Sequence, residues 1–256
     1  MSKENILRDP PKTYYREEAD TMDTNAFVKV VQNRRSVRMY TDEEVNEADL
    51  MSCMELALLA PTSSNLQPWE FYWLKDPKKK EKLIKYCLNQ PAARTAKELI
   101  VCVARTDTWR LNAKKILKEY KGNTSTPSSV IKYYQKIVPI AYSQGLFNIL
   151  GTVKRIVIAL IGLRKPIPRE PVSRADMRVW AHKTTALACQ NLMLAVRAYG
   201  YDSCPMEGMD SKRIRKMLKL PKKAEICMVI SVGKRAENGV YGKRFRLPSS
   251  EFIKVV

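Results

Sequence analysis

Residues 60–74 read APTSSNLQPWEFYWL, and in this stretch Pro61 and Pro68 bracket a group of polar side chains ahead of an aromatic run. The aromatic density of WEFYWL predicts a strand. The apolar stretch ADLMSCMELALLA before Pro61 predicts a helix that begins near residues 42–44 and stops ahead of the proline. The loop between them offers rigid hydroxyl and amide groups beside a hydrophobic wall, which suits a planar heteroaromatic ligand. A plain connecting loop is the alternative reading.

Helices and strands alternate on both sides of this loop. Upstream, AFVKVVQNRR has apolar residues at helical spacing, and Thr24 or Asp23 is expected to cap it. Downstream, the sequence predicts helices over 76–90, 107–121, 174–199 and 211–220, strands over 98–104 and 225–233, and loops over 122–129 and 201–210. This alternation indicates an α/β or α+β sandwich.

The chain is strongly basic. Its 256 residues include 46 Lys and Arg against 26 Asp and Glu, for a formal net charge of +20. The 9 Gly and 14 Pro residues form no period and no low-complexity tract, which excludes disordered and fibrous classes. A charge of this size favours a polyanionic partner: nucleic acid, an anionic membrane surface or a phosphorylated ligand.

The excess charge is concentrated in residues 109–175, which hold 13 Lys and Arg against only Glu119 and Glu170. The same segment contains the apolar stretch 145–163, which Lys154 and Arg155 interrupt. A spanning helix needs about 20 consecutive apolar residues, so a simple membrane span is rejected. We treat 109–175 as a basic and apolar insertion within a single domain covering 1–256.

The cysteines and the start of the chain indicate the compartment. The first residues are polar and mixed in charge, unlike a signal peptide. The scattered cysteines form no C-x-x-C pair, and His182 is the one histidine, so no metal site is expected. Buried reduced thiols and a cytoplasmic protein follow, with attachment to the inner face of the membrane as an alternative.

Two arginine-rich patterns point to an oxyanion. In the run RRSVR, Arg34, Ser36 and Arg38 alternate, so an extended chain places two guanidinium groups and a hydroxyl on one side. A solvated helix end is the alternative. Arg244 and Arg246 repeat the alternating arrangement near the C-terminus. Between these patterns, the turn Pro205–Gly208 leaves backbone N–H groups free to approach a ligand.

Together these motifs resemble the nitroreductase family of FMN-dependent oxidoreductases. The resemblance rests on RRSVRMY, APTSSNLQPWEFYWL, the long helix leading into CPMEGMD, and ISVGKR followed by RFRLP, in the family's order and near its spacing. It covers about residues 25–105 and 175–250. It implies an α+β fold, a three-layer α-β-α sandwich with a central mixed sheet flanked by helices. It also implies an intertwined homodimer with FMN at the interface.

The resemblance also implies site residues. Arg38, Glu207 and Gly208 are the catalytic candidates: Arg38 for the charge at the flavin pyrimidine edge, and the two backbone N–H groups for flavin N5 and O4. Ala92 replaces a lysine frequent in the family, which puts more of the pyrimidine contact on Arg38. The candidates for FMN binding are Arg34, Arg35, Ser36, Arg38, Pro61, Thr62, Ser63, Ser64, Asn65, Asn89, Pro205, Met206, Glu207, Gly208, Arg244 and Arg246. Residues 61–65 would act from the partner chain.

The implied activity is a ping-pong cycle. NAD(P)H passes hydride to flavin N5 and leaves, and a small planar acceptor such as a nitroaromatic or a quinone takes its place. The excess of basic residues weakly favours NADPH over NADH as the electron donor. One alternative is a flavoprotein at the membrane surface acting on a lipid-like or quinone acceptor. Another is a non-catalytic flavin-binding or anion-binding protein. His182 and Cys204 are expected to have structural roles.

The family pattern leaves the insertion unexplained, and three readings stay open. As a lid, it would offer aromatic side chains for stacking on the acceptor: Trp109, Tyr133, Tyr134, Tyr142 and Phe147. As a membrane-surface segment, it would use the apolar face of 145–165 and the cations Lys154, Arg155, Arg164 and Lys165. As a nucleic-acid module it lacks any helix-turn-helix, RNP or zinc pattern, so no nucleic-acid partner is expected.

Overall fold

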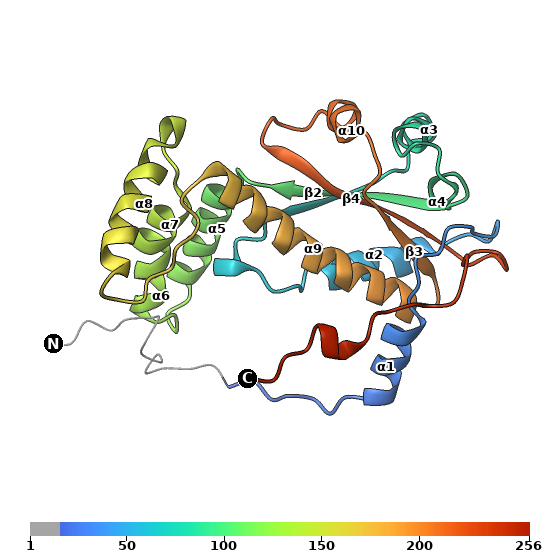
Figure 1. The fold of residues 1–256 in the computed structure, drawn as a ribbon, viewed down its shortest axis with the longest axis horizontal. Coiled ribbons are helices and arrows are strands. Elements are labelled where there is room, and N and C mark those ends of the chain that lie inside the picture. The colour runs from blue at the N-terminus through green and yellow to red at the C-terminus, as the bar shows by residue number, and fades with distance from the viewer. Residues whose placement is uncertain (1–15) are drawn as a thin grey trace.

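The computed structural model describes residues 16–256 and is built around a four-stranded sheet with the order β1-β2-β4-β3 (Figure 1). The strands are β1 (Trp69–Trp73), β2 (Glu98–Arg105), β3 (Asp202–Met206) and β4 (Ala224–Gly233). Strand β2 is buried on both faces because its side chains alternate between the two layers of helices. Leu99 and Val101 point to one layer, and Ile100 and Cys102 point to the other.

The sheet is antiparallel in all pairs of named strands in the described chain, whereas the resemblance implied a mixed sheet. The connection between β1 and β2 explains the first pair. Trp73, at the end of β1, pairs with Ile100 near the start of β2, so the chain leaves and re-enters the sheet at the same end of the strands. A parallel contact occurs only as the isolated bridge between Ser36 and Ser203 among residues 16–256.

Helices cover both faces of the sheet, which confirms the three-layer α-β-α sandwich (Figure 1). One face carries α2 (Glu47–Ala57) and the long helix α9 (Arg174–Ala198). The other face carries α3 (Pro77–Tyr86), α4 (Pro91–Arg94) and α10 (Ser211–Met217). The helix α1 (Thr24–Asn33) and the end of the chain, with a 3₁₀ turn at Ser249–Glu251, project away from the sandwich on the side of α9.

Several helix ends follow the capping residues in the sequence. Asp23 caps α1 by accepting from the N–H of Ala26 at 3.0 Å, and Asp76 caps α3 in the same way. Gly200 follows α9 with φ of 82°, a backbone conformation that favours glycine. Helix α2 begins later than expected, because the side chain of Asn46 accepts from the N–H groups of its first turn.

The prediction of a loop over 201–210 is wrong for its first half, which forms β3. This strand is short and contains Pro205, so the sequence has no recognisable strand pattern there. Proline is tolerated because β3 lies at the edge of the sheet, where a missing N–H costs little. Its partner is β4, with Asp202 opposite Gly233 and Met206 opposite Val229.

The insertion forms a helical body at the N-terminal end of α9 (Figure 1). It comprises α5 (Trp109–Gly122), α6 (Ser128–Lys132), a π-helical turn (Tyr133–Ile137), α7 (Val138–Tyr142), a 3₁₀ turn (Leu146–Asn148) and α8 (Ile149–Gly162). Helices α5 to α7 pack on the start of α9 through a core that includes Trp109, Tyr134 and Trp180. Helix α8 lies outside that core.

The apolar part of the insertion does not form a straight span. Across residues 16–256, each helix taken singly is too short or too polar to cross a bilayer. The bent pair Ser128–Tyr142 and Leu146–Gly162, with an angle of 74° at its break, would suffice on length and composition alone.

Candidate active site

A cationic pocket lies where the chain leaves α1 and meets the C-terminal segment. Residues 34–38 are extended: the N–H of Val37 donates to the Ser203 carbonyl at 3.1 Å, and the N–H of Arg38 donates to the Gly239 carbonyl at 2.8 Å. The side chain of Val37 is fully buried. Because side chains alternate along an extended chain, the neighbouring Ser36 and Arg38 point away from the core, as the sequence predicted.

The pocket has a volume of about 280 Å³. Its lining residues are Arg34, Arg35, Ser36, Arg38, Val240, Tyr241, Gly242, Lys243, Arg244, Phe245 and Arg246. No carboxylate belongs to this lining within the described residues. The structure therefore brings together the two arginine patterns, which are about 200 residues apart in sequence, and adds Lys243 and Tyr241, which sequence reasoning missed.

The arginines repel one another. Burial, followed by the charges of Arg244 and Arg246, lowers the pKa of Arg34. Two of the other arginines also hold the pocket together: Arg244 donates to the Arg34 carbonyl, and Arg35 donates to the Gly242 carbonyl at 2.6 Å. The guanidinium group of Arg38 lies 5.4 Å from the ring centre of Tyr241. An anion bound among these groups would relieve the repulsion.

A second element of the site is the turn that follows β3. The backbone N–H groups of Glu207 and Gly208 donate to no other group within residues 16–256, and both residues are exposed. The turn is held by Gln90, whose side-chain amide donates to the Gly208 carbonyl at 3.0 Å. The predicted residue Asn89 is the neighbour of Gln90 and has a left-handed backbone, with φ of 52°. Sequence reasoning missed Gln90.

Strand β3 connects the pocket and the turn. Ser203 bridges to Ser36 beside the arginines, and the strand ends at Met206. At about 3.3 Å for each residue, Met206 lies roughly 10 Å along the strand from Ser203, and the free N–H groups follow it. The arginines thus lie beside one end of β3, and the free backbone N–H donors lie just past its other end.

The polar loop 61–65 is held by tyrosines of the insertion. The hydroxyl groups of Ser63 and Tyr142 lie 2.8 Å apart, and those of Ser64 and Tyr133 lie 2.7 Å apart. Tyr134 donates to the Ser64 carbonyl at 2.8 Å. Because Ser64 and Asn65 both have positive φ, these contacts fix a backbone shape that the sequence does not favour.

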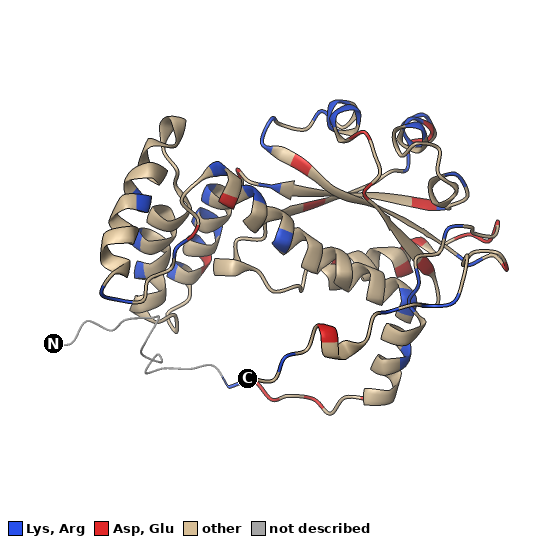
Figure 2. Ribbon diagram, in the orientation of Figure 1, with Lys and Arg blue, Asp and Glu red and all other residues tan. Residues whose placement is uncertain are grey.

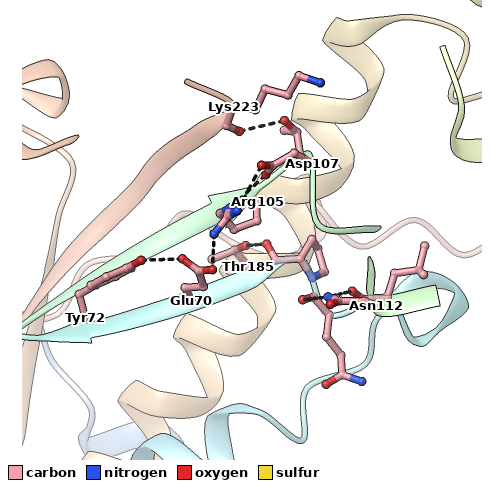
Figure 3. Close-up of polar contacts among 11 residues, drawn as sticks. Glu70, Tyr72, Arg105, Asp107, Asn112, Thr185 and Lys223 are labelled. Carbon is pink, nitrogen blue, oxygen red and sulfur yellow. Dashed lines mark hydrogen bonds and ion pairs between the residues drawn. The ribbon is translucent and has the colours of Figure 1, made fainter. Parts of the chain in front are cut away.

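Further contacts hold the end of the loop (Figure 3). Asn112 of α5 donates to the Leu66 carbonyl at 2.9 Å, and Thr185 of α9 donates to the Pro68 carbonyl at 3.2 Å. Beside them, Arg105 pairs with Asp107 at 3.0 Å and with Glu70 of β1. The insertion and the sheet therefore hold the loop from both sides.

The loop and the cationic pocket lie apart within one chain. The loop contacts helices α5 to α7 at one end of α9, whereas residues 34–38 follow α1 near the other end (Figure 1). None of residues 61–65 lines the arginine pocket in the described chain. The resemblance implied that residues 61–65 act on the flavin of a second chain, and within one chain they stand apart from the arginine pocket.

The aromatic residues expected to stack on an acceptor are mostly buried. The expectation that they act as stacking groups of a lid is therefore wrong for most of them. Trp109, Tyr134 and Tyr142 are each less than 10% exposed and pack in the core of the insertion. Tyr142, for example, lies edge-on to Trp180 with ring centres 5.0 Å apart. Phe147 alone of the five is strongly exposed, at 80%.

His182 and Cys204 have structural surroundings. The Nε2 atom of His182 lies 3.1 Å from a carboxylate oxygen of Glu225, which joins α9 to β4. Hydrogen bonding with Cys227, and then with Glu225, raises the pKa of His182. Cys204 is buried in the core beneath the arginine pocket, and burial raises the pKa of its thiol.

Replacing His182 with glutamine is expected to remove a small, pH-dependent part of the stability. Because the folded pKa of His182 is raised above about 6.5, its contribution is full below that pH and disappears as the pH rises through the folded pKa. Urea unfolding of both proteins should therefore show a free-energy difference below about 1 kcal/mol at acid pH that vanishes at alkaline pH. A difference that grows with pH would contradict this role.

Comparisons with known proteins agree with the geometry. The sequence profile of the Nitroreductase family matches residues 31–234. Protein DrgA of Synechocystis sp. is 26% identical over 219 residues, covering 85% of this chain and 88% of that protein. NADH dehydrogenase of Thermus thermophilus is 28% identical over 214 residues, covering 84% of this chain and 89% of that protein. A solved structure from Exiguobacterium sibiricum, described as a nitroreductase in complex with FMN, has a TM-score of 0.62 at 22% identity and covers 93% of this chain and 99% of that chain.

The matched range runs from α1 to the end of β4 and includes the first arginine pattern, the polar loop and the turn after β3. The chain belongs to the nitroreductase family. The solved structure shares its fold.

Proposed function

We propose that the protein is an FMN-dependent oxidoreductase that takes electrons from NAD(P)H and passes them to a small planar acceptor such as a nitroaromatic or a quinone. The observation that carries the proposal is the arginine pocket, whose described lining is cationic and free of carboxylates. The names of two similar proteins support the two cofactors. One is an NADH dehydrogenase, and the other is a nitroreductase in complex with FMN.

The residues present fit a phosphorylated flavin. The FMN phosphate would lie among Arg34, Arg244 and Arg246, where its charge would offset both the burial and the cation repulsion that lower the pKa of Arg34. Guanidinium groups suit this role because their donors match the geometry of phosphate oxygens. Ser36, on the same extended segment, would donate to the ribityl chain.

Bound FMN supplies hydride transfer between the nicotinamide and the acceptor. The chain supplies position and charge. The N–H groups of Glu207 and Gly208 would donate to the N5 and O4 edge of the ring, and Arg38 would place positive charge at the pyrimidine edge. Gln90 keeps the turn in place through the Gly208 carbonyl.

A homodimer would complete the site. The loop 61–65 lies away from the arginine pocket of its own chain, so we propose that it reaches the flavin of a second copy. Exposed apolar side chains on α1 and near the loop support such an interface: Phe27 is 62% exposed, and Leu59 is 76% exposed. Burying side chains of this size stabilises an assembly by about 25 cal/mol for each Å² removed from water.

Flavin binding and turnover test the proposal. Flavin-free protein should bind one FMN for each chain in a fluorescence titration, elute as a dimer, and oxidise NAD(P)H when a nitroaromatic or quinone is present. Comparing NADH with NADPH shows which nicotinamide it prefers. Protein that cannot be reconstituted with FMN would contradict the proposal.

Replacing both Tyr133 and Tyr142 with phenylalanine is expected to weaken FMN binding about tenfold in the dimer. The change at Tyr133 removes one hydroxyl contact to the polar loop and the change at Tyr142 removes two, and a hydrogen bond of this kind contributes about 1 kcal/mol to holding the loop. A titration of the flavin-free double variant measures the effect. Tyr199→Phe, which lies outside these contacts, is the matched control and should bind as the wild type does. Unchanged affinity of the double variant would show that the tyrosines do not position the loop.

A further inference from the structure

Helix α8 presents its apolar side chains outward. Five of them, together with the residue that follows the helix, are between 46% and 81% exposed: Ile149, Val153, Ile156, Val157, Leu160 and Leu163. We call these six residues the α8 apolar face. None of them belongs to a hydrophobic core cluster of residues 16–256. A row of this kind on a water-facing helix is costly unless something covers it.

The inward side of α8 is mostly small and polar, with Gly151, Lys154 and Gly162 beside one isoleucine, Ile158. A side chain at Gly151 would come within 2.2 Å of the Val172 carbonyl, so the helix packs backbone against backbone there. Lys154 also points inward, where its ammonium group donates to the carbonyls of Ala141 at 2.8 Å and Pro171 at 3.0 Å. The chain thus satisfies the charge of Lys154 inside the protein and turns the apolar residues out, which is the reverse of an ordinary surface helix.

The charges around α8 have one sign. No Asp or Glu occurs between Glu119 and Glu170, whereas Arg155, Arg164 and Lys165 are exposed on or beside the helix. Figure 2 shows blue and no red along α8. Two copies of this segment packed face to face would bring like charges together. Anionic headgroups above an apolar layer would instead match both the cations and the α8 apolar face.

The dimensions favour a helix lying in the plane of a membrane. Helix α8 has 14 residues and so is about 21 Å long, which is short of the roughly 30 Å hydrocarbon layer. A sharp bend in the chain precedes it; we call this bend the break. Gly145 has φ of 70° there, and Leu146 and Phe147 are strongly exposed. We propose that α8 and this break dock on a bilayer that contains anionic lipids, with the α8 apolar face among the acyl chains. The proposal does not depend on the flavin.

Vesicle flotation of the full-length protein tests the proposal. The protein should float with vesicles of phosphatidylcholine and phosphatidylglycerol, should not float with phosphatidylcholine alone, and should be partly released by high salt. The double variant Ile156→Asp/Leu160→Asp should bind at least about tenfold more weakly. The triple variant Arg155→Gln/Arg164→Gln/Lys165→Gln should lose about fivefold for each charge removed.

Matched controls separate docking from misfolding and from self-association. Leu111→Asp/Val179→Asp places the same two charges at apolar positions of similar exposure outside α8 and should float as the wild type does. Circular dichroism and FMN content should be unchanged in all variants, because α8 contributes nothing to the described core. Wild-type protein that stays off anionic vesicles would overturn the proposal. So would an α8 double variant that floats normally. A third contrary result combines two observations: the wild type fails to float, and an α8 variant loses the oligomeric state of the wild type. That result would show that the α8 apolar face packs against a second copy of the chain.

Discussion

Alanine at both Arg34 and Arg244 is expected to weaken FMN binding about 100-fold or more. Each guanidinium lines the pocket assigned to the phosphate, and a hydrogen bond to a charged group contributes about 1.5–3 kcal/mol. A fluorescence titration of flavin-free protein measures the change. Each single variant should lie between the wild type and the double variant. Arg244→Lys should recover only part of the affinity, because lysine lacks the planar fork of donors.

The same variants should leave the flavin-free protein about as stable as before. Burial, and then the charges of Arg244 and Arg246, lower the pKa of Arg34, so removing a pocket cation relieves repulsion when no anion is bound and offsets the lost hydrogen bond from Arg244 to the Arg34 carbonyl. Arg213→Ala, an exposed site whose side chain pairs with Asp210, is the matched control for removing a surface arginine. Full FMN affinity in the Arg34→Ala/Arg244→Ala double variant would place the phosphate elsewhere.

Proline at Gly208 is expected to slow flavin reduction by NAD(P)H about 100-fold. Proline lacks the backbone N–H, and removing one preorganised donor from a site of developing charge costs about 100-fold to 1,000-fold in rate. Stopped-flow absorbance of the FMN-loaded variant follows the reduction directly. FMN should still bind, because the arginines proposed to hold its phosphate lie near the other end of β3 and are untouched.

Gly208→Ala is the matched control. A Cβ atom at this position would meet only the Gln90 amide within 4 Å among the described residues, at 3.9 Å, and Gly208 has no positive φ that would strain alanine. Alanine keeps the N–H, so reduction should stay near the wild-type rate. If Gly208→Ala is as slow as Gly208→Pro, the turn itself matters and the N–H does not.

Local patterns in the sequence predicted much of the fold and the arginine half of the site. Asp23, Asp76 and Gly200 cap helices through contacts within a few residues, so their roles are readable without tertiary structure. The alternation in RRSVR likewise fixed which side chains share a side once the segment was extended. These predictions succeed because the physics that decides them is local.

The remaining features depend on contacts between distant residues. Strand β3 exists because β4 lies beside it, and nothing within DSCPM reveals that partner. The tyrosines Tyr133 and Tyr142 looked available for stacking on a ligand. Their true direction is set by the loop 69 to 79 residues earlier and by the core of the insertion. The inward turn of Lys154 is also invisible in sequence, because its acceptors are carbonyls of α7 and of the segment before α9.

The tyrosine contacts have a consequence for how the insertion can be altered. Helices α5 to α7 hold the polar loop through Asn112, Tyr133 and Tyr142, so excising them would leave the loop without support. Among the described residues, helix α8 contributes no side chain to that loop or to the hydrophobic clusters, and it is held instead by Lys154 and by the backbone packing at Gly151. The two halves of the insertion therefore differ: the first is part of the scaffold, and the outward residues of the second can be exchanged while the rest of the molecule stays intact, provided that Gly151 and Lys154 are kept.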